Sequence, residues 1–258
     1  GALRGLVWPF QWLGLKGDVN LPPVTRALQA LGPAYIKFGQ VLSTRPDVVG
    51  TELAVQLRVL QDKLPPFPIE VAKAEIEKEL GVNIDTVFAD FSEPVAAASI
   101  AQVHKARLVS DGEFVAIKVL RPGIEKAFQK DIDAFYLAAS IFNAFSPSAR
   151  RLRPLDVIEH FEGVVLSELD LRLESASASE FADNTENDAG FTLPRVRWGL
   201  SARRVMTLDW AEGINAADVD DIAAAGHDLT ELSRRVLQLF LNHALRDGYF
   251  HADMHHGN

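Results

Sequence analysis

The first third of the chain is predicted to be mainly helical, because its apolar residues recur every three or four positions between recognisable start and stop signals. A Pro-Pro pair begins the first pattern, and Gly32-Pro33 separates it from the second. The proline-rich segment Leu64–Pro68 indicates a rigid connector, and Gly81 ends the last helix of this part. The predicted helices cover residues 22–31, 34–43, 51–60 and 69–80.

The pattern changes near residue 85, where short apolar runs rich in β-branched residues replace the helical spacing. The sequence Ser110-Asp111-Gly112 joins two of these runs and is typical of a hairpin turn. The predicted strands cover residues 87–91, 101–109, 113–120, 195–198 and 204–208, and further helices are predicted for residues 123–145, 155–183 and 229–246. We therefore expect an α+β fold with a five-stranded sheet, preceded by a helical extension.

Composition and charge narrow the classes of function. The chain has 258 residues, of which 48% are hydrophobic, so it can bury a sizeable core in one or two lobes. Its formal net charge of -9 and its pI near 5.3 argue against a general nucleic-acid binder, which would carry a basic excess. Without cysteine, metal ligands must be oxygen or imidazole. The longest mainly apolar run, residues 134–145, is about half of the ~20 residues that a membrane-spanning helix needs.

The end of the chain carries the pattern His251-x-Asp253, with Asn258 five positions further on. This spacing is typical of a kinase catalytic loop, in which the aspartate meets the substrate hydroxyl and the asparagine binds a metal ion on the ATP phosphates. Two other interpretations remain open for this stretch. His251, Asp253, His255 and His256 could bind a divalent metal, because imidazole and carboxylate suit such ions, or the stretch could be a polar loop that closes a helical domain.

Two upstream segments favour the kinase interpretation. The run from Ala96 to Val103 has the spacing A-x-A-x-x-A-x-V, which matches the kinase phosphate-covering loop with alanine in place of each glycine. Val115-Ala116-Ile117-Lys118 is the sequence of the strand that carries the phosphate-binding lysine. Alone, an Ala-rich run usually reflects packing, and Val-Ala-Ile-Lys is usually just a strand. Their order and hairpin spacing, followed by the loop, together indicate a kinase-like protein.

A kinase also needs a helix carboxylate to pair with the strand lysine, and Glu174 is the candidate. If residues 155–183 form one helix, Asp170 shares the face of Glu174, and Glu168 points about 160° away from Asp170. A solvated acidic helix is the alternative. The segment Asp209–Gly213 follows the last predicted strand and is the expected hinge, whose backbone would meet adenine.

Lys37 and Gln40 are three positions apart and therefore share one face of the second predicted helix. Gly39 lies between them, and glycine in mid-helix costs up to about 1 kcal/mol relative to alanine. We expect it to let a neighbouring backbone approach closely. An ordinary surface pair is the alternative for Lys37 and Gln40. Charge complementarity predicts that this helix brings Lys37 near Glu168 or Asp170.

Together these segments resemble the UbiB (ADCK, aarF-type) atypical kinases from about Leu28 to Asn258. The residues that carry the resemblance are Lys37-Phe38-Gly39-Gln40, Ser43-Thr44-Arg45-Pro46-Asp47, the Ala-rich run through Gln102-Val103-His104, Val115-Ala116-Ile117-Lys118, Glu168-Leu169-Asp170 with Glu174, and His251-Ala252-Asp253. The resemblance implies a protein-kinase-like fold whose N-terminal helical extension covers the usual protein-substrate cleft. It also implies ATPase-type activity in place of protein phosphorylation, a role in isoprenoid-quinone (ubiquinone) biosynthesis, and peripheral membrane association.

The resemblance also assigns roles to matching positions. Lys118 and Glu174 would form the ion pair, and Asp253 would be the catalytic-loop acid. The contact between the extension and the active site would consist of Lys37, Gln40, Glu168 and Asp170. ATP or ADP is the expected cofactor, together with Mg²⁺, for which Asn258 is an expected ligand. The expected nucleotide contacts are Ala96, Ala97, Ala98, Ser99, Ala101, Val103, Ala116, Lys118, Leu208, Asp209, Trp210 and Ala211.

The same resemblance predicts domains and partners. Residues 1–84 would be the extension, 85–211 the small lobe with its inserted helices and hinge, and 212–258 the start of the large lobe. The expected partners are adenine nucleotide, a quinone-precursor lipid, quinone-biosynthesis proteins and the cytoplasmic side of a membrane, either the bacterial inner membrane or its organellar equivalent. Nucleic acid is not expected. A non-catalytic, nucleotide-gated scaffold for lipid or partner proteins is the main alternative, and a conventional protein kinase is a weaker one.

The chain departs from the family pattern in its last loop. Met254 and His256 stand where prolines are usual, so we expect the loop to be less rigid. The Asp-Phe-Gly segment, whose aspartate is a principal magnesium ligand in kinases, would follow Asn258. We therefore interpret the chain, which opens with Gly1, as an incomplete piece that is inactive by itself.

Overall fold

The computed structural model describes residues 21–58, 60, 64–145 and 149–250. The strands are β1 (Phe88–Ala89), β2 (Pro94–Ala97), β3 (Ala101–Leu108), β4 (Phe114–Leu120) and β5 (Val205–Asp209). The α-helices are α2 (Pro23–Leu31), α3 (Pro33–Ser43), α4 (Pro46–Val49), α5 (Thr51–Leu57), α6 (Ile69–Leu80), α7 (Ile84–Val87), α8 (Ile124–Phe145), α9 (Pro154–Glu168), α10 (Leu171–Asn184), α11 (Val219–Ala224) and α12 (Leu229–Asn242). Short 3₁₀ turns cover Ala149–Leu152 and Trp198–Leu200, and a π-helical turn covers His243–Asp247.

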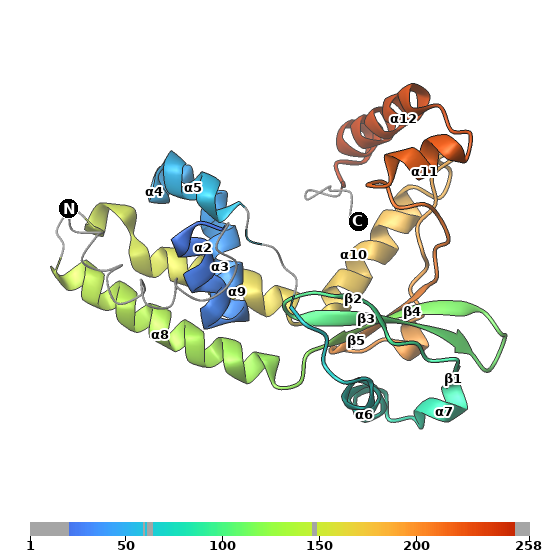
Figure 1. Ribbon diagram of the computed structural model, residues 1–258, viewed down its shortest axis with the longest axis horizontal. Coiled ribbons are helices and arrows are strands. Elements are labelled where there is room, and N and C mark those ends of the chain that lie inside the picture. The colour runs from blue at the N-terminus through green and yellow to red at the C-terminus, as the bar shows by residue number, and fades with distance from the viewer. Residues whose placement is uncertain (1–20, 59, 61–63, 146–148, 251–258) are drawn as a thin grey trace.

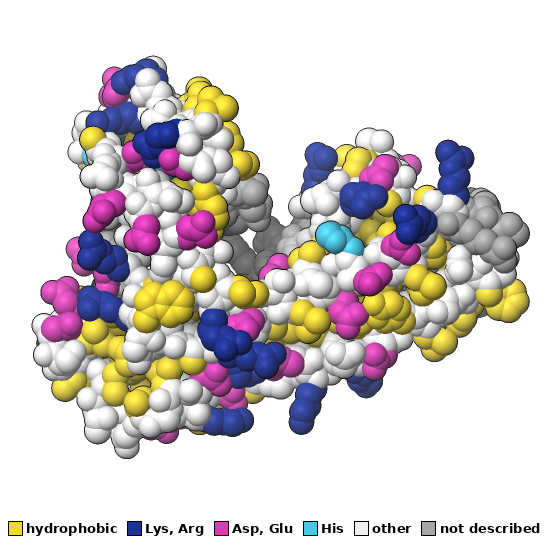
Figure 2. Space-filling model, turned by 180° about the vertical axis from the view of Figure 1, so that it is seen from behind, with side chains coloured by type: hydrophobic (Ala, Val, Ile, Leu, Met, Phe, Trp, Pro, Cys, Tyr) yellow, Lys and Arg dark blue, Asp and Glu magenta, His cyan; other side chains and the backbone are white. Residues whose placement is uncertain are grey.

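The sheet lies between two helical arms (Figure 1). One arm consists of α8 and α9, on which the N-terminal helices α2 to α5 rest, and the other arm contains α11 and α12. Seen from behind, the molecule is hollowed between the two arms (Figure 2). No helix in the described ranges is long and apolar enough to cross a membrane.

All strand pairs of the sheet are antiparallel. The strand order is β1-β3-β4-β5, and β2 also pairs with β3. Because successive side chains of a strand point to opposite faces, β4 divides its residues between two environments. Val115, Ile117 and Val119 are fully buried on one face, whereas Ala116 and Lys118 are half-buried on the other.

Helix α6 covers the first of these faces. Ala72 and Ile76 lie about one turn apart on α6 and are completely buried in a core that they share with Val115, Ile117 and Val119. As predicted, α6 ends at Gly81, whose φ of 68° lies in the left-handed region that favours glycine. The predicted boundary near residue 85 assigns α6 to the extension, although its core belongs to the sheet. The division into domains stays a prediction.

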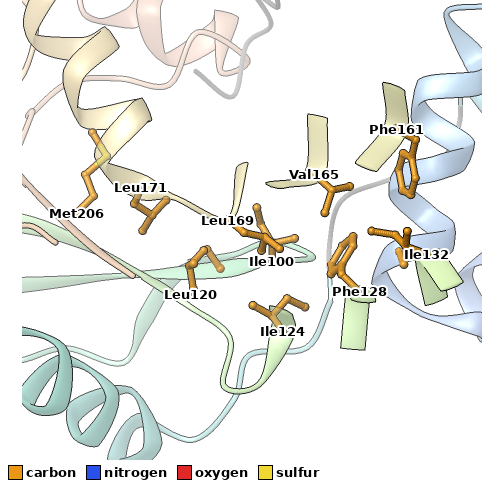
Figure 3. Close-up of a cluster of buried hydrophobic side chains, with 12 residues drawn as sticks. Ile100, Leu120, Ile124, Phe128, Ile132, Phe161, Val165, Leu169, Leu171 and Met206 are labelled. Carbon is orange, nitrogen blue, oxygen red and sulfur yellow. The ribbon is translucent and has the colours of Figure 1, made fainter. Parts of the chain in front are cut away.

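A second core joins the other face of the sheet to the two long helices (Figure 3). Ile124, Phe128 and Ile132 recur every four residues along α8 and form one buried stripe. Phe161 and Val165 form the corresponding stripe of α9. This spacing is the helical periodicity that predicted these two segments.

An aromatic cluster fastens the N-terminal helices to this second core. The ring of Phe38 on α3 stacks on Phe135 of α8 at a centroid distance of 4.7 Å and meets Phe161 of α9 edge-on at 5.1 Å. Both distances lie in the range of favourable aromatic pairs. Helix α3 is therefore docked on α8 and α9, not on the α6 side of the sheet.

The predicted α+β fold with a five-stranded sheet is confirmed, but the identity of one strand was wrong. Residues 195–198 form no strand, and Val196 makes only an isolated bridge to Leu208. A 3₁₀ turn begins at Trp198 and prevents longer pairing. The fifth strand is instead β2, which takes in the first part of the Ala-rich run.

The single helix predicted for residues 155–183 was also wrong. Helix α9 ends at Glu168, and α10 begins at Leu171. Asp170 between them is extended and caps α10, because its side chain accepts a hydrogen bond from the Arg172 N–H at 3.1 Å. Since the helix is interrupted, Asp170 does not share a helix face with Glu174.

The predicted helix over residues 229–246 is shorter than expected, since α12 ends at Asn242 and a π-helical turn follows. No side chain of α12 is buried within the described part of the chain. Its exposed apolar residues include Leu232, Val236, Leu237 and Leu241. This arm adds little to the described core. The described residues of the candidate site lie on the sheet, the Ala-rich turn and α10.

Candidate functional site

An ion pair lies at the centre of the candidate site. Lys118 of β4 donates to both carboxylate oxygens of Glu174 on α10, with its Nζ 2.7 Å from each. The predicted salt-bridge distance is therefore confirmed. The lysine side chain is 29% exposed and the carboxylate 48%. A solvent-exposed ion pair of this kind contributes only about 0–1 kcal/mol to the stability of the fold. Its contribution to stability therefore does not explain why the two residues are paired here.

The ion pair lies on the face of the sheet opposite α6. The second core covers one end of this face, where Leu120 and Met206 are buried, and we call the rest, around Lys118 and Ala116, the uncovered face. In the strand register, Val103 of β3 and Met206 of β5 flank Lys118, and Leu208 of β5 lies opposite Ala116. Val103, Ala116 and Leu208 are half-buried and form an apolar strip beside the lysine. A strip of this kind can take the flat face of a base while the lysine reaches toward phosphates.

The Ala-rich run forms the hairpin turn between β2 and β3, next to this strip. Ala96 and Ala97 belong to β2, and Ala101 begins β3. The Ala98 N–H donates to the Ala101 carbonyl at 2.8 Å and closes the turn. Ile100 projects into the second core (Figure 3). The turn is therefore packed onto the fold and is not an open flap.

Ser99 in this turn is completely buried, and its hydroxyl has no hydrogen-bond partner among the described residues. A buried polar group without a partner costs about 1–3 kcal/mol. We therefore expect Ser99→Ala to leave the free energy of unfolding unchanged or to raise it, as measured by urea denaturation. Ser175→Ala is the matched control, because the buried Ser175 hydroxyl donates to the Leu171 carbonyl at 2.8 Å. The control should destabilise by about 1 kcal/mol; equal losses in both variants would contradict this reading of Ser99.

The segment expected to be the hinge follows β5, and its residues already make contacts with the sheet. The Trp210 N–H donates to the Phe114 carbonyl at 2.9 Å and ties the segment to the end of β4. The Asp209 carboxylate accepts a hydrogen bond from Arg197 at 2.5 Å and is therefore already engaged. The Trp210 ring lies 4.4 Å from the Lys105 ammonium, a cation–π distance. Ala211 is exposed.

The residues predicted to join the extension to the site meet only in part. Lys37 of α3 forms an ion pair with Glu168 at the end of α9, with an N–O distance of 2.8 Å. Asp170 instead forms an ion pair with Arg172 at 2.6 Å, which holds the pKa of its carboxyl below the usual range. The Gln40 side chain donates to the Leu60 carbonyl at 3.4 Å. Lys37 thus pairs with Glu168, the first of its two predicted partners. The helix breaks after Glu168, and Asp170 instead caps α10.

Gly39 makes a different close contact from the one predicted. A Cβ atom at this position would lie 2.3 Å from the end of the Leu60 side chain and 2.9 Å from that of Leu28. The close neighbours are therefore side chains of the extension and not a backbone segment. Gly39 allows α3 to pack tightly within the N-terminal helices.

The predicted catalytic-loop residues Asp253 and Asn258 lie outside the described residues, as do the histidines of the alternative metal site. Within the ranges that the structure describes, no group of three or more His, Asp or Glu side chains is placed to hold a metal ion. The described part of the site thus offers a cation and an apolar strip, but no metal-binding cluster.

Sequence reasoning missed the side chains that hold the Ala-rich turn. Arg121, directly after β4, donates to the Ala98 carbonyl from two nitrogens. Gln102 exchanges hydrogen bonds with the backbone of Phe67 and also contacts the buried His104 at 2.8 Å. His104 donates through Nδ1 to the Ser92 carbonyl at 2.8 Å, and burial lowers its pKa. Gln102 and His104 belong to the family resemblance, whereas a lone arginine after a strand forms no recognisable pattern.

Comparison with known proteins places this geometry in a family. The model of the ABC1 atypical kinase-like domain matches residues 59–258. Among curated relatives, the probable protein kinase UbiB of Marinobacter nauticus is 41% identical over 233 residues, which are 90% of this chain and 42% of the relative. The probable protein kinase UbiB of Pseudomonas aeruginosa is 41% identical over 260 residues, covering 99% of this chain and 48% of the relative.

A third relative, the probable protein kinase UbiB of Aliivibrio fischeri, is 42% identical over 233 residues, which are 90% of this chain and 43% of that protein. The chain thus spans less than half the length of these curated relatives. The match to the family model covers most of the chain, and the matched residues include the Lys118–Glu174 pair, the Ala-rich turn and all five strands of the sheet. The chain therefore belongs to the ABC1 atypical kinase-like family, and the predicted resemblance to UbiB proteins is confirmed.

Proposed function

We propose that this chain is the adenine-nucleotide-binding part of an atypical kinase that hydrolyses ATP, or phosphorylates a small molecule, in support of isoprenoid-quinone (ubiquinone) biosynthesis. The observation that carries the proposal is the Lys118–Glu174 pair on the uncovered face of the sheet, beside the turn at Ala98. The UbiB names of the relatives support the link to ubiquinone.

The residues of the uncovered face suit an adenine nucleotide. Val103, Ala116 and Leu208 would bind the base, and the backbone at Trp210 and Ala211 would meet its edge. Lys118, held in place by Glu174, would bind phosphate oxygens. When bound, Mg²⁺-ATP would supply the phosphoryl group. Because phosphoryl transfer depends mainly on positioning and charge stabilisation, the chief task of this face is to hold the phosphates in one geometry.

The roles proposed for the remaining residues follow the family pattern. Asp253 would be the catalytic-loop acid and Asn258 a ligand of Mg²⁺. Lys37 with Glu168 would hold the extension near the site, with Gln40 and Asp170 as neighbours. We also propose the division into an extension, a small lobe from residue 85 to 211 and the start of a large lobe.

A lipid partner is supported by an apolar cavity in the arm that carries the extension. The cavity has a volume of about 380 Å³ and lies between α3, α4, α5, α8 and α9. The described residues that line it are all apolar, among them Phe38, Leu42, Phe142 and Val157. A cavity of this size and polarity suits an apolar ligand. We propose a quinone-precursor lipid as its chemical class, with peripheral association at the cytoplasmic side of a membrane.

A nucleotide-gated scaffold is the second candidate function. The observation that favours it is the packing of the Ala-rich turn, in which Ser99 and Ile100 are buried. A turn fixed in this way could bind nucleotide and order the lobes without efficient transfer.

Phosphate release by the full-length protein, with and without phospholipid vesicles, tests the proposal. We expect ATP hydrolysis that vesicles increase. Binding of ATP without release, with or without vesicles, would favour the scaffold. Failure to bind any adenine nucleotide would refute both candidate functions.

Replacing Ala98 by glycine should change the ratio of ATP to ADP affinity, because the methyl group restricts the backbone that faces the phosphates. The difference in conformational freedom between alanine and glycine, about 0.5–1 kcal/mol, corresponds to a change of about two- to fivefold. Nucleotide titration of the full-length protein measures the ratio. Ala223→Gly on α11 is the control and should leave it unchanged. Identical ratios in wild type and Ala98→Gly would show that the alanines are only packing residues.

A further inference from the structure

The guanidinium of Arg121 contacts the Ala-rich turn and joins it to a segment that is far away in the sequence. Its Nε and Nη2 lie 3.1 and 2.9 Å from the carbonyl oxygen of Ala98. The same Nη2 lies 2.9 Å from the carbonyl oxygen of Pro65, in the connector that precedes α6. One side chain therefore holds the turn and the connector together.

Two further contacts make this arrangement specific. The Arg121 guanidinium carbon lies 5.6 Å from the centre of the Phe67 ring, within cation–π distance. The side-chain amide of Gln102 accepts a hydrogen bond from the Phe67 N–H at 2.9 Å and donates one to the Phe67 carbonyl at 3.2 Å. The connector is thus fixed to the turn by Arg121 and to the adjoining strand by Gln102.

Arg121 forms no ion pair with any carboxylate among the described residues, and burial lowers the pKa of its guanidinium. Partial burial of a cation costs free energy when no carboxylate neutralises it. Hydrogen bonds of good geometry to carbonyl oxygens offset that cost. The planar fork of arginine suits this task, because it can hold several acceptors at fixed angles.

The held carbonyl has a consequence for the neighbouring amide. The carbonyl of Ala98 and the N–H of Ser99 belong to one planar trans peptide and point in opposite directions. When Arg121 holds the carbonyl, it therefore fixes the plane of the whole Ala98–Ser99 peptide. Because Ser99 is completely buried, this peptide is held from the inner side of the turn, and it sets the position of the half-buried Ala98.

We propose that Arg121 is a positioning residue, which holds the Ala98 peptide so that the Ala-rich turn keeps one fixed position at the site of the nucleotide phosphates, and which links that position to the connector at Pro65–Phe67. The inference rests on the proposed nucleotide binding for its effect on affinity. The link between turn and connector does not depend on nucleotide.

The test compares Arg121→Gln with wild type in the full-length protein. Affinities for ATP and for adenosine are measured by titration. We expect the affinity for ATP to fall about tenfold, the scale of one lost charge-assisted hydrogen bond, while the affinity for adenosine stays the same, because only the phosphates meet the turn. Arg121→Lys should restore little, since lysine keeps the charge but not the fork. Equal losses for ATP and adenosine, no loss at all, or full rescue by lysine would overturn the proposal.

Hydrogen exchange without nucleotide tests the link separately. The amides of Ala98 and Phe67, which bond to Ala101 and Gln102, should exchange faster in Arg121→Gln. Arg107→Gln is the matched control, because Arg107 bonds Asp90 at the far end of β3. If Arg121→Gln does not fold, Phe67→Leu removes the ring beneath the guanidinium and should give a smaller shift of the same kind. If wild type binds no nucleotide, the proposed function fails, and unchanged exchange would refute the link itself.

Discussion

Replacing Lys118 by methionine is expected to lower ATP turnover by the full-length protein about 100- to 1,000-fold, the usual cost of removing one electrostatic group aimed at a developing charge. The lysine lies on the uncovered face of the sheet, and Glu174 holds its Nζ at 2.7 Å through both carboxylate oxygens. Glu174→Gln should cost less, about tenfold, because the lysine keeps its charge and loses only its orientation. Steady-state phosphate release measures both effects.

The loss in Lys118→Met should not come from unfolding. The ion pair is open to solvent, so its removal should change the free energy of unfolding by no more than about 1 kcal/mol. Lys78→Met is the control, because Lys78 is exposed on α6, on the other side of the sheet. Turnover that survives in Lys118→Met, in a protein whose nucleotide affinity is intact, would contradict the assigned role.

Replacing Gly39 by alanine should destabilise the protein, whereas the same change at Gly163 should stabilise it. A Cβ at Gly39 would lie 2.3 Å from the Leu60 side chain, but a Cβ at Gly163 would meet nothing within 4 Å. Overpacking costs about 1–3 kcal/mol, and alanine regains up to about 1 kcal/mol of helix propensity. We therefore expect a loss of about 1–2 kcal/mol for Gly39→Ala and a gain of roughly 0.5–1 kcal/mol for Gly163→Ala.

Urea unfolding of the two variants measures the difference, with the slope of the transition as a check on cooperativity. Gly163 is a suitable partner because it lies within a helix, α9, and is exposed. Shifts of the same sign in both variants would show that the ends of the Leu60 and Leu28 side chains move aside for the added methyl group, and would contradict the predicted overpacking.

The sequence was sufficient where local patterns and tertiary packing agree. Helix α6 has the predicted bounds, because Pro68 and Gly81 mark its ends and its apolar spacing matches the face that it buries. The ion pair was predictable because Val115-Ala116-Ile117-Lys118 sets the strand and its register, which leaves Lys118 on the uncovered face.

The sequence was not sufficient where one residue outweighs a longer pattern. Helical spacing continues through residues 155–183, yet Asp170 caps a new helix, because its side chain binds the Arg172 N–H. Aspartate is a favoured capping residue, so the signal was present but was read as a continuous acidic face. The pairing of residues 195–198 failed for a related reason, since the turn at Trp198 limits it to one bridge.

The hold of Arg121 on Ala98 could not have been predicted from local patterns. Ala98 and Arg121 lie 23 positions apart, and Pro65 lies 56 positions before the arginine. Their meeting depends on how β2, β3 and β4 pair and on where the connector crosses the sheet. Such contacts follow from the fold as a whole, which no short motif encodes.

The central claim is that the uncovered face of the sheet binds adenine nucleotide beneath the Ala-rich turn. Hydrogen exchange of the full-length protein, measured peptide by peptide with and without Mg²⁺-ATP, tests it most directly. The account predicts slower exchange in residues 97–103 and 209–211, with no change in α6, which covers the opposite face. Protection confined to α6 or to the loop before α12, with residues 97–103 unaffected, would contradict it.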